Sequence, residues 1–335
     1  MAKIKVNLPA RPVGGKERSY AVVVGKGILP ELGGIIENEG WGRDIFVITD
    51  PLVNKLYGKT LKRAATFEVP RGERYKSLAT AEKLYDRLLR RGAHRDSLII
   101  ALGGGVVGDM AGFVAATYMR GINYIQVPTT LLAQVDAALG GKTAVNHPQC
   151  KNLIGSFYQP KMVFCDVKTL ATLPPREVRT GLAEVVKYGV IANAELFKLL
   201  ERNTDHLTTI VAESVKIKAR VVAKDERETG LRMILNFGHT VGHAIESLTR
   251  YQIYNHGEAV AVGMVAASLI ACRLKMMGEG EAERIMSLLE KLGLPTAIKK
   301  LSAARIVQLL ALDKNARGGK VLFVLPEKIG KVVIR

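Results

Sequence analysis

Three histidines that are close together in the sequence are the first residues whose spacing suggests chemistry. His239 and His243 are four residues apart in NFGHTVGHAIES, and His256 follows in YNHGEAV. If the first segment is one helix, four residues make about one turn, so both rings project from one face and could share a metal ion or a substrate. A single helical histidine more often belongs to a packed core. Three of the six histidines within eighteen residues weaken that interpretation, because each buried ring needs a hydrogen-bond partner.

A metal site built on these histidines needs a carboxylate, and Glu184 is the best candidate. It lies with Lys187 in GLAEVVKYG, an apolar segment that predicts a helix. The spacing alone equally allows an exposed ion pair between residues i and i+3. A Glu/His/His set without thiolates leaves a coordination position open, which suits a catalytic zinc or cobalt ion better than a structural one.

The segment SLIIALGGGVVGDMAGF predicts a strand, a glycine loop and a helix. Gly103, Gly105 and Gly108 satisfy the G-x-G-x-x-G spacing, and the helix N-terminus would offer N–H groups to a pyrophosphate. The loop departs from the usual dinucleotide pattern, because it follows a late strand and PTT occupies the place of the acidic ribose partner. Asp50, after the strand DIFVIT, is the alternative ribose partner. Asp109, in the first helical turn, either favours the helix dipole or faces the nicotinamide. A tight turn without a ligand remains the other interpretation, but three consecutive glycines favour the dinucleotide.

The elements that must position these residues change in kind along the chain. Apolar runs in the first half, each predicted to be a buried strand, are residues 20–25, 44–49, 64–69, 97–102, 123–127 and 162–165. They alternate with amphipathic segments, as is typical of an α/β domain with a mainly parallel sheet. Helical patterns replace them after the Pro-containing segment 170–181. We therefore expect a dinucleotide-binding α/β domain over residues 1–171 and an all-α domain over residues 172–335.

Composition excludes several classes of protein. The chain has 335 residues, 48% of them hydrophobic, and a formal net charge of +18. Lys and Arg are dispersed and aromatic residues are only 6%, so a small anionic substrate ranks above nucleic acid. We expect a cytoplasmic protein without a membrane partner, since no stretch resembles a membrane span or a signal peptide. Cys150, Cys165 and Cys272 form no Cys-x-x-Cys pair, so neither a disulfide framework nor a zinc knuckle is indicated.

Several segments together resemble the 3-dehydroquinate synthase family, whose activity is the second step of the shikimate pathway. They occur in the family's order from about residue 50 onward and are GGGVVGD, VPTTLLAQVDAALGGKTAVN, KNLIGSFYQP, GLAEVVKYG, RMILNFGHTVGHAIE and NHGEAVAVGM. The resemblance implies a sugar-phosphate cyclase with an N-terminal NAD-binding domain, a helical metal-binding domain, an active site between them and a homodimer. The substrate that it implies is 3-deoxy-D-arabino-heptulosonate 7-phosphate, which carries a carboxylate and a phosphate.

The resemblance also implies roles for individual residues. The metal ligands fall on Glu184, His239 and His256, whereas His243 lies beside the ion among the substrate and proton-relay groups. The residues that match NAD contacts are Asp50, Glu73, Lys76, Gly104, Gly105, Val106, Asp109, Thr129, Thr130, Asp136, Thr172 and Leu173. Those that match substrate contacts are Lys142, Lys151, Asn152, Lys187, Lys218, Arg232 and Asn236, with Lys142 and Lys151 shared with the cofactor and Arg120 reaching the partner subunit's site.

Two positions depart from the family's pattern. In LDKNARGGK, Lys314 is followed by Asn where the family commonly has a second lysine, and Lys314 is carried over as the catalytic C-terminal lysine. After Asp50 the chain continues with Pro51 and Leu52, without the polar residue that some members place near the ribose.

Two other activities remain open. One is a cyclase that acts on another sugar phosphate, such as 2-deoxy-scyllo-inosose synthase, although its substrate lacks a carboxylate for Lys218 and Arg232. The other is a metal-dependent polyol or glycerol-phosphate dehydrogenase, which would release NADH. A basic binding module without catalytic activity is the remotest interpretation.

Overall fold

The protein is described by a computed structural model that covers residues 1–9, 18–42, 44–61, 63–249, 252–298, 301–310 and 321–335. The chain forms two compact units. The first contains Met1–Leu173 and Lys218–Glu226, and the second contains Pro174–Ile217 and Arg227–Arg335. None of the helices within the described ranges is long and apolar enough to cross a membrane.

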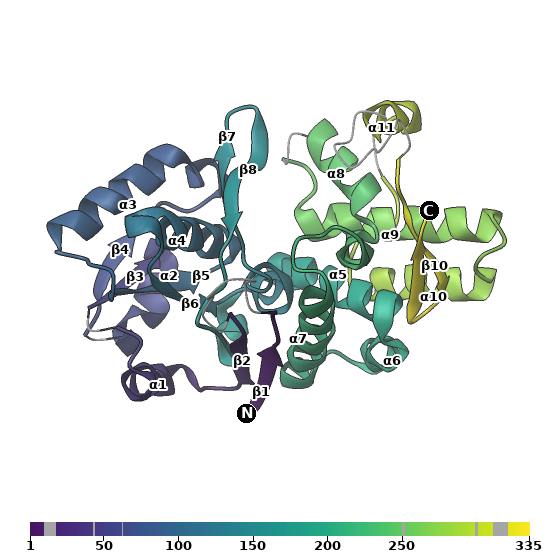
Figure 1. Ribbon diagram of the computed structural model, residues 1–335. Helices are drawn as coiled ribbons and strands as arrows, with labels where there is room; N and C mark the ends of the chain where they lie inside the picture. Colours follow the sequence, from purple (N-terminus) through teal and green to yellow (C-terminus); the bar gives the residue numbers. More distant parts are fainter. Residues whose placement is uncertain (10–17, 43, 62, 250–251, 299–300, 311–320) are drawn as a thin grey trace. The chain divides into compact units, whose positions relative to one another are not determined.

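The first unit is built on a sheet that, within the described ranges, has seven strands in the order β1-β2-β9-β6-β5-β3-β4 (Figure 1). The strands are β1 (Ala2–Val6), β2 (Tyr20–Gly25), β3 (Ile45–Thr49), β4 (Ala65–Glu68), β5 (Leu98–Gly103), β6 (Asn123–Pro128) and β9 (Met162–Asp166). All neighbours run parallel except β1, which pairs antiparallel with β2. The six apolar runs of the sequence form β2 to β6 and β9, so the mainly parallel sheet is confirmed.

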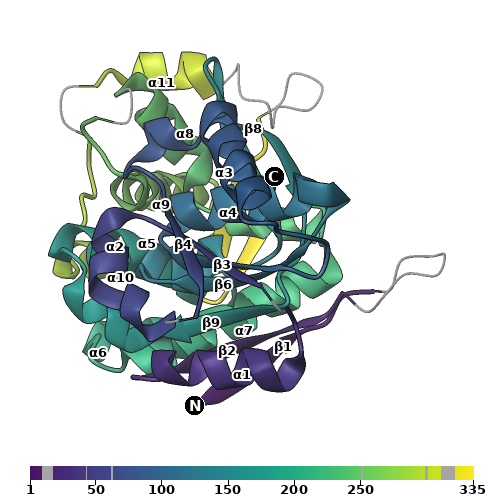
Figure 2. The ribbon, with the colours of Figure 1, turned by 90° about the vertical axis from the view of Figure 1, so that its left-hand side faces the viewer.

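Helices cover both faces of this sheet. They are α1 (Leu32–Glu39), α2 (Pro51–Tyr57), α3 (Leu78–Arg90) and α4 (Gly105–Thr117). In β5, Ile99 and Ala101 pack in one core with α3 and α4, whereas Ile100 and Leu102 pack in a second core with α1. Figures 1 and 2 show α3 and α4 on one face and α1 on the other. Burial on both faces explains why these strands are continuous apolar runs rather than alternating ones.

A hairpin and several short helices complete the first unit. The hairpin joins β7 (Lys142–His147) and β8 (Cys150–Phe157) in an antiparallel pair, with a shift in register between Val145 and His147. The short helices are η1 (Leu29–Glu31), η2 (Gly58–Leu61), η3 (Glu73–Tyr75), η4 (Tyr118–Arg120), η5 (Ala133–Ala137) and η6 (Val167–Thr172). The sequence patterns missed β7 and β8, because β8 is mostly exposed and is not an apolar run.

The second unit is mainly helical, as expected. Its helices are α5 (Pro175–Ala192), α6 (Ala194–Arg202), η7 (Leu231–Asn236), α8 (His239–Leu248), α9 (His256–Arg273), α10 (Glu279–Lys291) and α11 (Ala303–Leu310), and α7 (Leu207–Lys224) begins in it. It is not wholly α-helical, because β10 (Val324–Lys328) and β11 (Lys331–Ile334) form an antiparallel hairpin. The two short strands are connected by a turn at Gly330, whose φ is +94°, and they were not predicted although both contain apolar residues.

Glycines let three helices of the second unit approach closely. A Cβ on Gly263 of α9 would lie 1.9 Å from the carbonyl oxygen of Gly238, and a Cβ on Gly257 would lie 2.5 Å from the backbone of Thr180 on α5. Gly238 also has a φ of +81° and precedes α8, which begins at His239. The segment 236–247 is therefore not one helix, as the histidine spacing assumed, but His239 and His243 still share α8.

Candidate metal and dinucleotide sites

Glu184, His239 and His256 come together in the second unit. Glu184 lies in the middle of α5, whereas His239 and His256 are the first residues of α8 and α9. Each offers one ligand atom, and these atoms all lie within 4.8 Å of one another. The Nε2 atoms of both histidines lie 3.5 Å from Oε1 of Glu184. One carboxylate oxygen and two imidazole nitrogens are a donor set that suits zinc or cobalt and leaves a coordination position open.

The opposite ring nitrogens hold the two imidazoles in orientation. Nδ1 of His239 lies 3.2 Å from the carbonyl oxygen of Phe237, which can only accept a hydrogen bond. Nδ1 of His256 lies 3.3 Å from Oε1 of Glu246, a buried residue of α8. With Nδ1 donating, Nε2 of each ring keeps its lone pair for an ion near Glu184. Glu246 was not among the residues expected at the site, although a carboxylate in the segment GHAIES was an available signal.

The pKa values of the two histidines shift in opposite directions. Burial lowers the pKa of His239 well below its ordinary value, although Glu184 opposes the shift. Burial also disfavours the charged form of His256, but hydrogen bonds to Glu184 and Glu246 outweigh it and raise its pKa to about 10. A proton on His256 therefore balances the nearby carboxylates, and a divalent ion would replace it.

Glu184 and Lys187 are not the exposed pair that their spacing allowed. Their side chains are 0% and 1% exposed, and Lys187 Nζ pairs with Oε2 of Glu184. The ammonium group also lies 5.0 Å from the centre of the Tyr188 ring. A charged pair buried at this depth is costly unless it is closely matched, and it excludes the solvated helix face that the spacing also allowed.

His243 lies next to the ligand group without joining it. Its side chain is exposed, and its ring centre is 5.4 Å from that of His239 and 6.4 Å from that of His256. Four-residue spacing made it a possible ligand, but among the described residues the donor cluster comprises Glu184 and the other two histidines. The role beside the ion that the resemblance implies for His243 stays a prediction.

Arg232 and Asn236 lie on η7 of the same unit. The Arg232 side chain is almost fully buried. Nδ2 of Asn236 donates a hydrogen bond of 3.0 Å to Oε1 of Glu228. A guanidinium shielded from water forms stronger paired hydrogen bonds with a carboxylate than an exposed one does.

The glycine loop joins β5 to α4 in the first unit. Gly103 is the last residue of β5, and Gly104 is the N-cap of α4. None of Gly103, Gly104 and Gly105 has a positive φ. Close packing explains the glycines better: a Cβ on Gly103 would lie 2.8 Å from the Val107 side chain, and one on Gly108 would lie 2.7 Å from Gln126. A glycine N-cap places no side chain over the helix N-terminus, which leaves its N–H groups accessible to an anion.

Charged residues around this loop form two pairs within the first unit. Lys76 Nζ contacts both Oδ2 of Asp109 and Oδ1 of Asn152. Burial raises the pKa of Asp109 although Lys76 opposes the shift, and the residue lies in the second turn of α4 rather than the first. Lys218 Nζ donates to the Asp136 carboxylate and, at 2.7 Å, to its carbonyl oxygen. These pairs connect residues expected to contact NAD with residues expected to contact substrate.

Asp50 directly follows β3, which ends at Thr49, and caps α2. Its Oδ1 accepts hydrogen bonds from the N–H groups of Leu52 at 3.0 Å and Val53 at 3.2 Å, and Arg71 Nε lies 3.6 Å away. The cap fixes this carboxylate at the carboxyl end of a parallel strand, where ligands of open α/β sheets bind.

The remaining expected residues lie in the following places. In the first unit they are Glu73 on η3, Val106 on α4, exposed Arg120 on η4 with a φ of +66°, Thr129 and Thr130 after β6, exposed Lys142 at the start of β7, Lys151 on β8, and Thr172 and Leu173 at the end of η6. Thr172 Oγ1 lies 2.7 Å from the Tyr57 hydroxyl. Lys314 lies outside the described residues.

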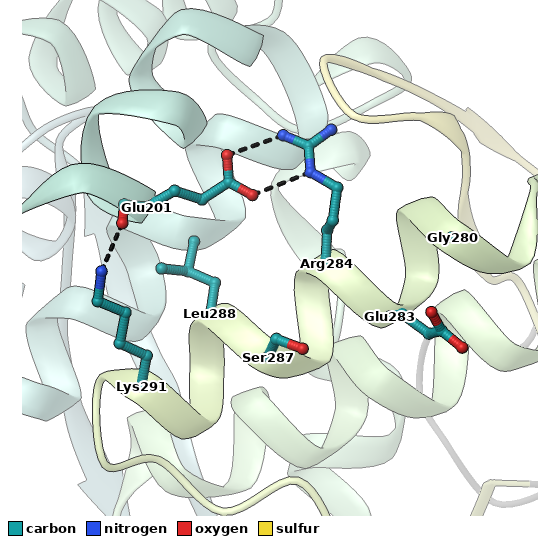
Figure 3. A pocket seen from close by; sticks show the side chains of 7 residues that line it. All are labelled: Glu201, Gly280, Glu283, Arg284, Ser287, Leu288 and Lys291. Carbon is teal, nitrogen blue, oxygen red and sulfur yellow. Dashed lines mark hydrogen bonds and ion pairs between the residues drawn. The ribbon is translucent and has the colours of Figure 1, made fainter.

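A surface hollow of about 280 Å³ lies between α6 and α10 (Figure 3). Its lining residues are Glu201, Gly280, Glu283, Arg284, Ser287, Leu288 and Lys291. Arg284 donates two hydrogen bonds to the Glu201 carboxylate, at 2.8 and 2.9 Å, and Lys291 donates to the Glu201 carbonyl oxygen. The two cationic side chains of the hollow, Arg284 and Lys291, are therefore hydrogen-bonded to Glu201. None of the lining residues matches an expected site residue, so we do not assign the substrate to this hollow.

The fold is that of the sugar-phosphate cyclases. A structure of 2-deoxy-scyllo-inosose synthase with carbaglucose-6-phosphate, NAD+ and Co2+ is similar to this chain, with a TM-score of 0.85, 29% identity and coverage of 100% of this chain and 94% of that chain. A structure of 2-epi-5-epi-valiolone synthase from Streptomyces hygroscopicus subsp. jinggangensis, with NAD+ and Zn2+ bound, has a TM-score of 0.86, 29% identity and coverage of 97% and 94%.

Sequence comparison defines the family more closely. Models of the N-terminal and C-terminal parts of 3-dehydroquinate synthase match residues 66–180 and 181–316. The 3-dehydroquinate synthase of Pelotomaculum thermopropionicum is 50% identical over 352 residues, which cover 100% of this chain and 93% of that protein. The chain belongs to the 3-dehydroquinate synthase family, and the resemblance seen in its motifs is confirmed.

Proposed function

We propose that this chain catalyses the 3-dehydroquinate synthase reaction, a carbon–oxygen lyase reaction on a phosphate ester. It converts 3-deoxy-D-arabino-heptulosonate 7-phosphate to 3-dehydroquinate and phosphate through transient oxidation, phosphate elimination, re-reduction, ring opening and intramolecular aldol closure. The observation that carries the proposal is the cluster of Glu184, His239 and His256 in a chain 50% identical to a relative of that name.

Two bound groups complete the proposed site. NAD+ supplies a reversible hydride acceptor, and a zinc or cobalt ion supplies a Lewis acid at the hydroxyl that is oxidised. Glu184, His239 and His256 would hold the ion. The N-terminus of α4 at Gly104 and Gly105 would hold the pyrophosphate of NAD.

The chain's own polar side chains would orient a doubly anionic substrate. We assign Lys218 and Arg232 to its carboxylate, and we assign Lys142, Asn152, Asn236 and Lys314 to its phosphate. Lys218 supports this assignment because its contact with Asp136 holds the ammonium in place. The work of these residues is positioning and charge stabilisation, since the substrate's own phosphate can accept the proton during elimination.

Two features of the proposal rest on the resemblance alone. They are a homodimer and a contribution of Arg120 to the partner subunit's site. A cytoplasmic location, expected from the sequence, is also part of the proposal.

The proposed reaction is tested by supplying the heptulosonate phosphate with substoichiometric NAD+. Because the hydride is returned within each turnover, we expect many turnovers per NAD+, phosphate release in proportion to product and no net NADH. Phosphate is measured colorimetrically and NADH by absorbance. Net NADH formed one-for-one with substrate consumed, without phosphate, would show a dehydrogenase instead.

Arg232→Lys tests the assignment of the substrate carboxylate. A lysine keeps the charge but cannot form the two parallel hydrogen bonds of a guanidinium, so kcat/KM should fall by an amount equivalent to about one to three kcal/mol. The matched control is Arg284→Lys, which breaks the paired hydrogen bonds to Glu201 outside the site and should leave kcat/KM unchanged. Equal kinetics for Arg232→Lys and the unaltered chain would place the carboxylate elsewhere and favour a cyclase with another substrate.

A further inference from the structure

Asn146 stands where the β7–β8 hairpin departs from regular pairing. The register of the two strands shifts between Val145 and His147, so Asn146 lies at a bulge and has no partner in the β8 ladder. Its backbone N–H instead donates a 2.8 Å hydrogen bond to the carbonyl oxygen of Lys76. Asn146 therefore pairs with the segment that follows η3 instead of with β8.

The side chain of Asn146 also forms hydrogen bonds to two separate segments of the chain, at Glu73 and at Asn152. Its Nδ2 donates to Glu73, at 2.8 Å to Oε1 and at 3.4 Å to the carbonyl oxygen. Its Oδ1 accepts a 2.9 Å hydrogen bond from the backbone N–H of Asn152. The amide group of asparagine has both a donor and an acceptor, so one side chain makes both kinds of contact at once.

Asn152 is held by contacts of its backbone and its side chain. Its φ is +55°, a left-handed conformation that asparagine adopts more readily than other non-glycine residues. The hydrogen bond from its N–H to Asn146 fixes the backbone, and Lys76 Nζ contacts its side-chain oxygen. The same Lys76 pairs with Asp109, so the contacts of Asn146 and Lys76 form one connected network.

We propose that Asn146 is a positioning residue that couples the NAD contacts Glu73 and Lys76 to the substrate contact Asn152. It acts through these three residues and touches neither cofactor nor substrate. The inference rests on the proposed function, because the roles of the three residues belong to it. As a result, the β7–β8 hairpin and the segment 73–76 adopt together the conformations that bind substrate and NAD.

Asn146→Asp separates the two halves of this coupling. The carboxylate keeps an acceptor for the Asn152 N–H but replaces the donor to Glu73 with a negative charge facing a carboxylate. We expect the dissociation constant and KM for NAD+ to rise about tenfold or more, within the range of energetic coupling between contacting residues. At saturating NAD+, kcat should fall by no more than about threefold. A general loss of folded protein would lower kcat and leave the dissociation constant of the remaining protein unchanged.

The matched control is Asn54→Asp on α2. Asn54 Nδ2 also donates to a glutamate, with 2.6 Å to Oε1 of Glu68, so the same replacement meets the same kind of neighbour outside the network. It should leave NAD+ affinity unchanged within about twofold. Thermal unfolding of each variant verifies that it is folded. Asn146→Ser, which adds no charge but is too short to bridge Glu73 and Asn152, replaces the first variant if that one does not fold, and the same rise in KM is expected.

Direct titration with NAD+ distinguishes the possible failures. If the unaltered chain binds NAD+ and the folded Asn146 variant binds it equally well, the positioning role is overturned while the proposed function stands. If the unaltered chain does not bind NAD+, the proposed function fails and this inference fails with it. Weaker binding by both Asn146→Asp and Asn54→Asp would overturn the specific role of Asn146, because any asparagine-to-aspartate change near a glutamate would then have this effect.

Discussion

Glu184→Gln is expected to leave a folded chain that no longer retains its divalent ion and has lost about three orders of magnitude or more in kcat. Glu184 is the charged member of the donor cluster, and its Oε1 lies 3.5 Å from Nε2 of both His239 and His256. A neutral amide of the same size is a much weaker ligand than a carboxylate. Without the Lewis acid the reaction loses several kcal/mol of stabilisation in its transition state, and each 1.36 kcal/mol corresponds to a tenfold change in rate.

Glutamine is the better replacement at this position because Glu184 is also the buried partner of Lys187. Either replacement removes the counter-charge of Lys187, which costs about 3–5 kcal/mol of stability, but glutamine keeps the volume of the side chain and a hydrogen-bond acceptor for the ammonium group, whereas alanine keeps neither. Metal per chain is measured by elemental analysis after dialysis against a weak chelator. A second arm removes the ion from the unaltered chain with a strong chelator, and zinc or cobalt should then restore turnover.

Glu258→Gln is the matched control for this loss of metal. Glu258 is two residues after His256 and is paired with Arg176 at 2.7 and 2.8 Å. Its carboxylate also accepts the N–H of Asn255 in the cap of α9, so its loss should cost stability of about 1 kcal/mol but no metal. Stoichiometric metal retained in Glu184→Gln, His239→Ala and His256→Ala alike would refute the ligand assignment.

The α/β part of the fold was predictable because its strands are buried on both faces. Such strands are continuous apolar runs, and each of the six runs in the sequence forms a strand of the parallel sheet. The strands that were missed are of another kind: β1 alternates in its exposure, and β8 exposes most of its residues. Their pairing depends on partners rather than on a local pattern of hydrophobicity.

The metal cluster was only partly predictable for a related reason. Spacing along one helix made His239 and His243 equally good candidates for metal ligands. No local pattern in the sequence indicates that His256 is a better candidate than His243. The distinction arises because α8 and α9 pack with a glycine contact, so that a Cβ on Gly263 would lie 1.9 Å from the Gly238 oxygen. That contact joins residues 25 positions apart, which periodicity cannot show. The choice of His256 came from the family motifs instead.

Positioning residues were the hardest to find from sequence. Asn146 contacts Glu73, 73 residues earlier in the chain. Glu246 contacts His256 across the turn between two helices. Neither has a spacing that indicates its partner, because a hydrogen bond between distant segments is fixed by the tertiary fold alone.

His243→Ala is expected to keep the divalent ion and yet lower kcat by about a hundredfold or more, the range of a general acid–base group. The ring lies 5.4 Å, centre to centre, from His239 and is exposed, so it is close to the ligands and accessible to a substrate hydroxyl. An imidazole ring has one nitrogen that can accept a proton and one that can donate it, which suits it to carry a proton during oxidation and re-reduction. Metal content and kcat, measured on the same preparation, separate the two roles.

Chemical rescue tests whether His243→Ala loses rate because it lacks a proton-transfer group or because it lacks a side chain with another role. If His243 moves a proton, added imidazole should restore part of the rate of His243→Ala, because a small base can occupy the space of the missing ring. The matched control is His206→Ala, which removes an exposed histidine between α6 and α7 and should neither lose rate nor respond to imidazole. Metal lost from His243→Ala to the same extent as from His239→Ala would instead make His243 a ligand. A full rate in His243→Ala would remove it from the proton path, since a group that transfers protons in the rate-limiting step cannot be deleted without cost.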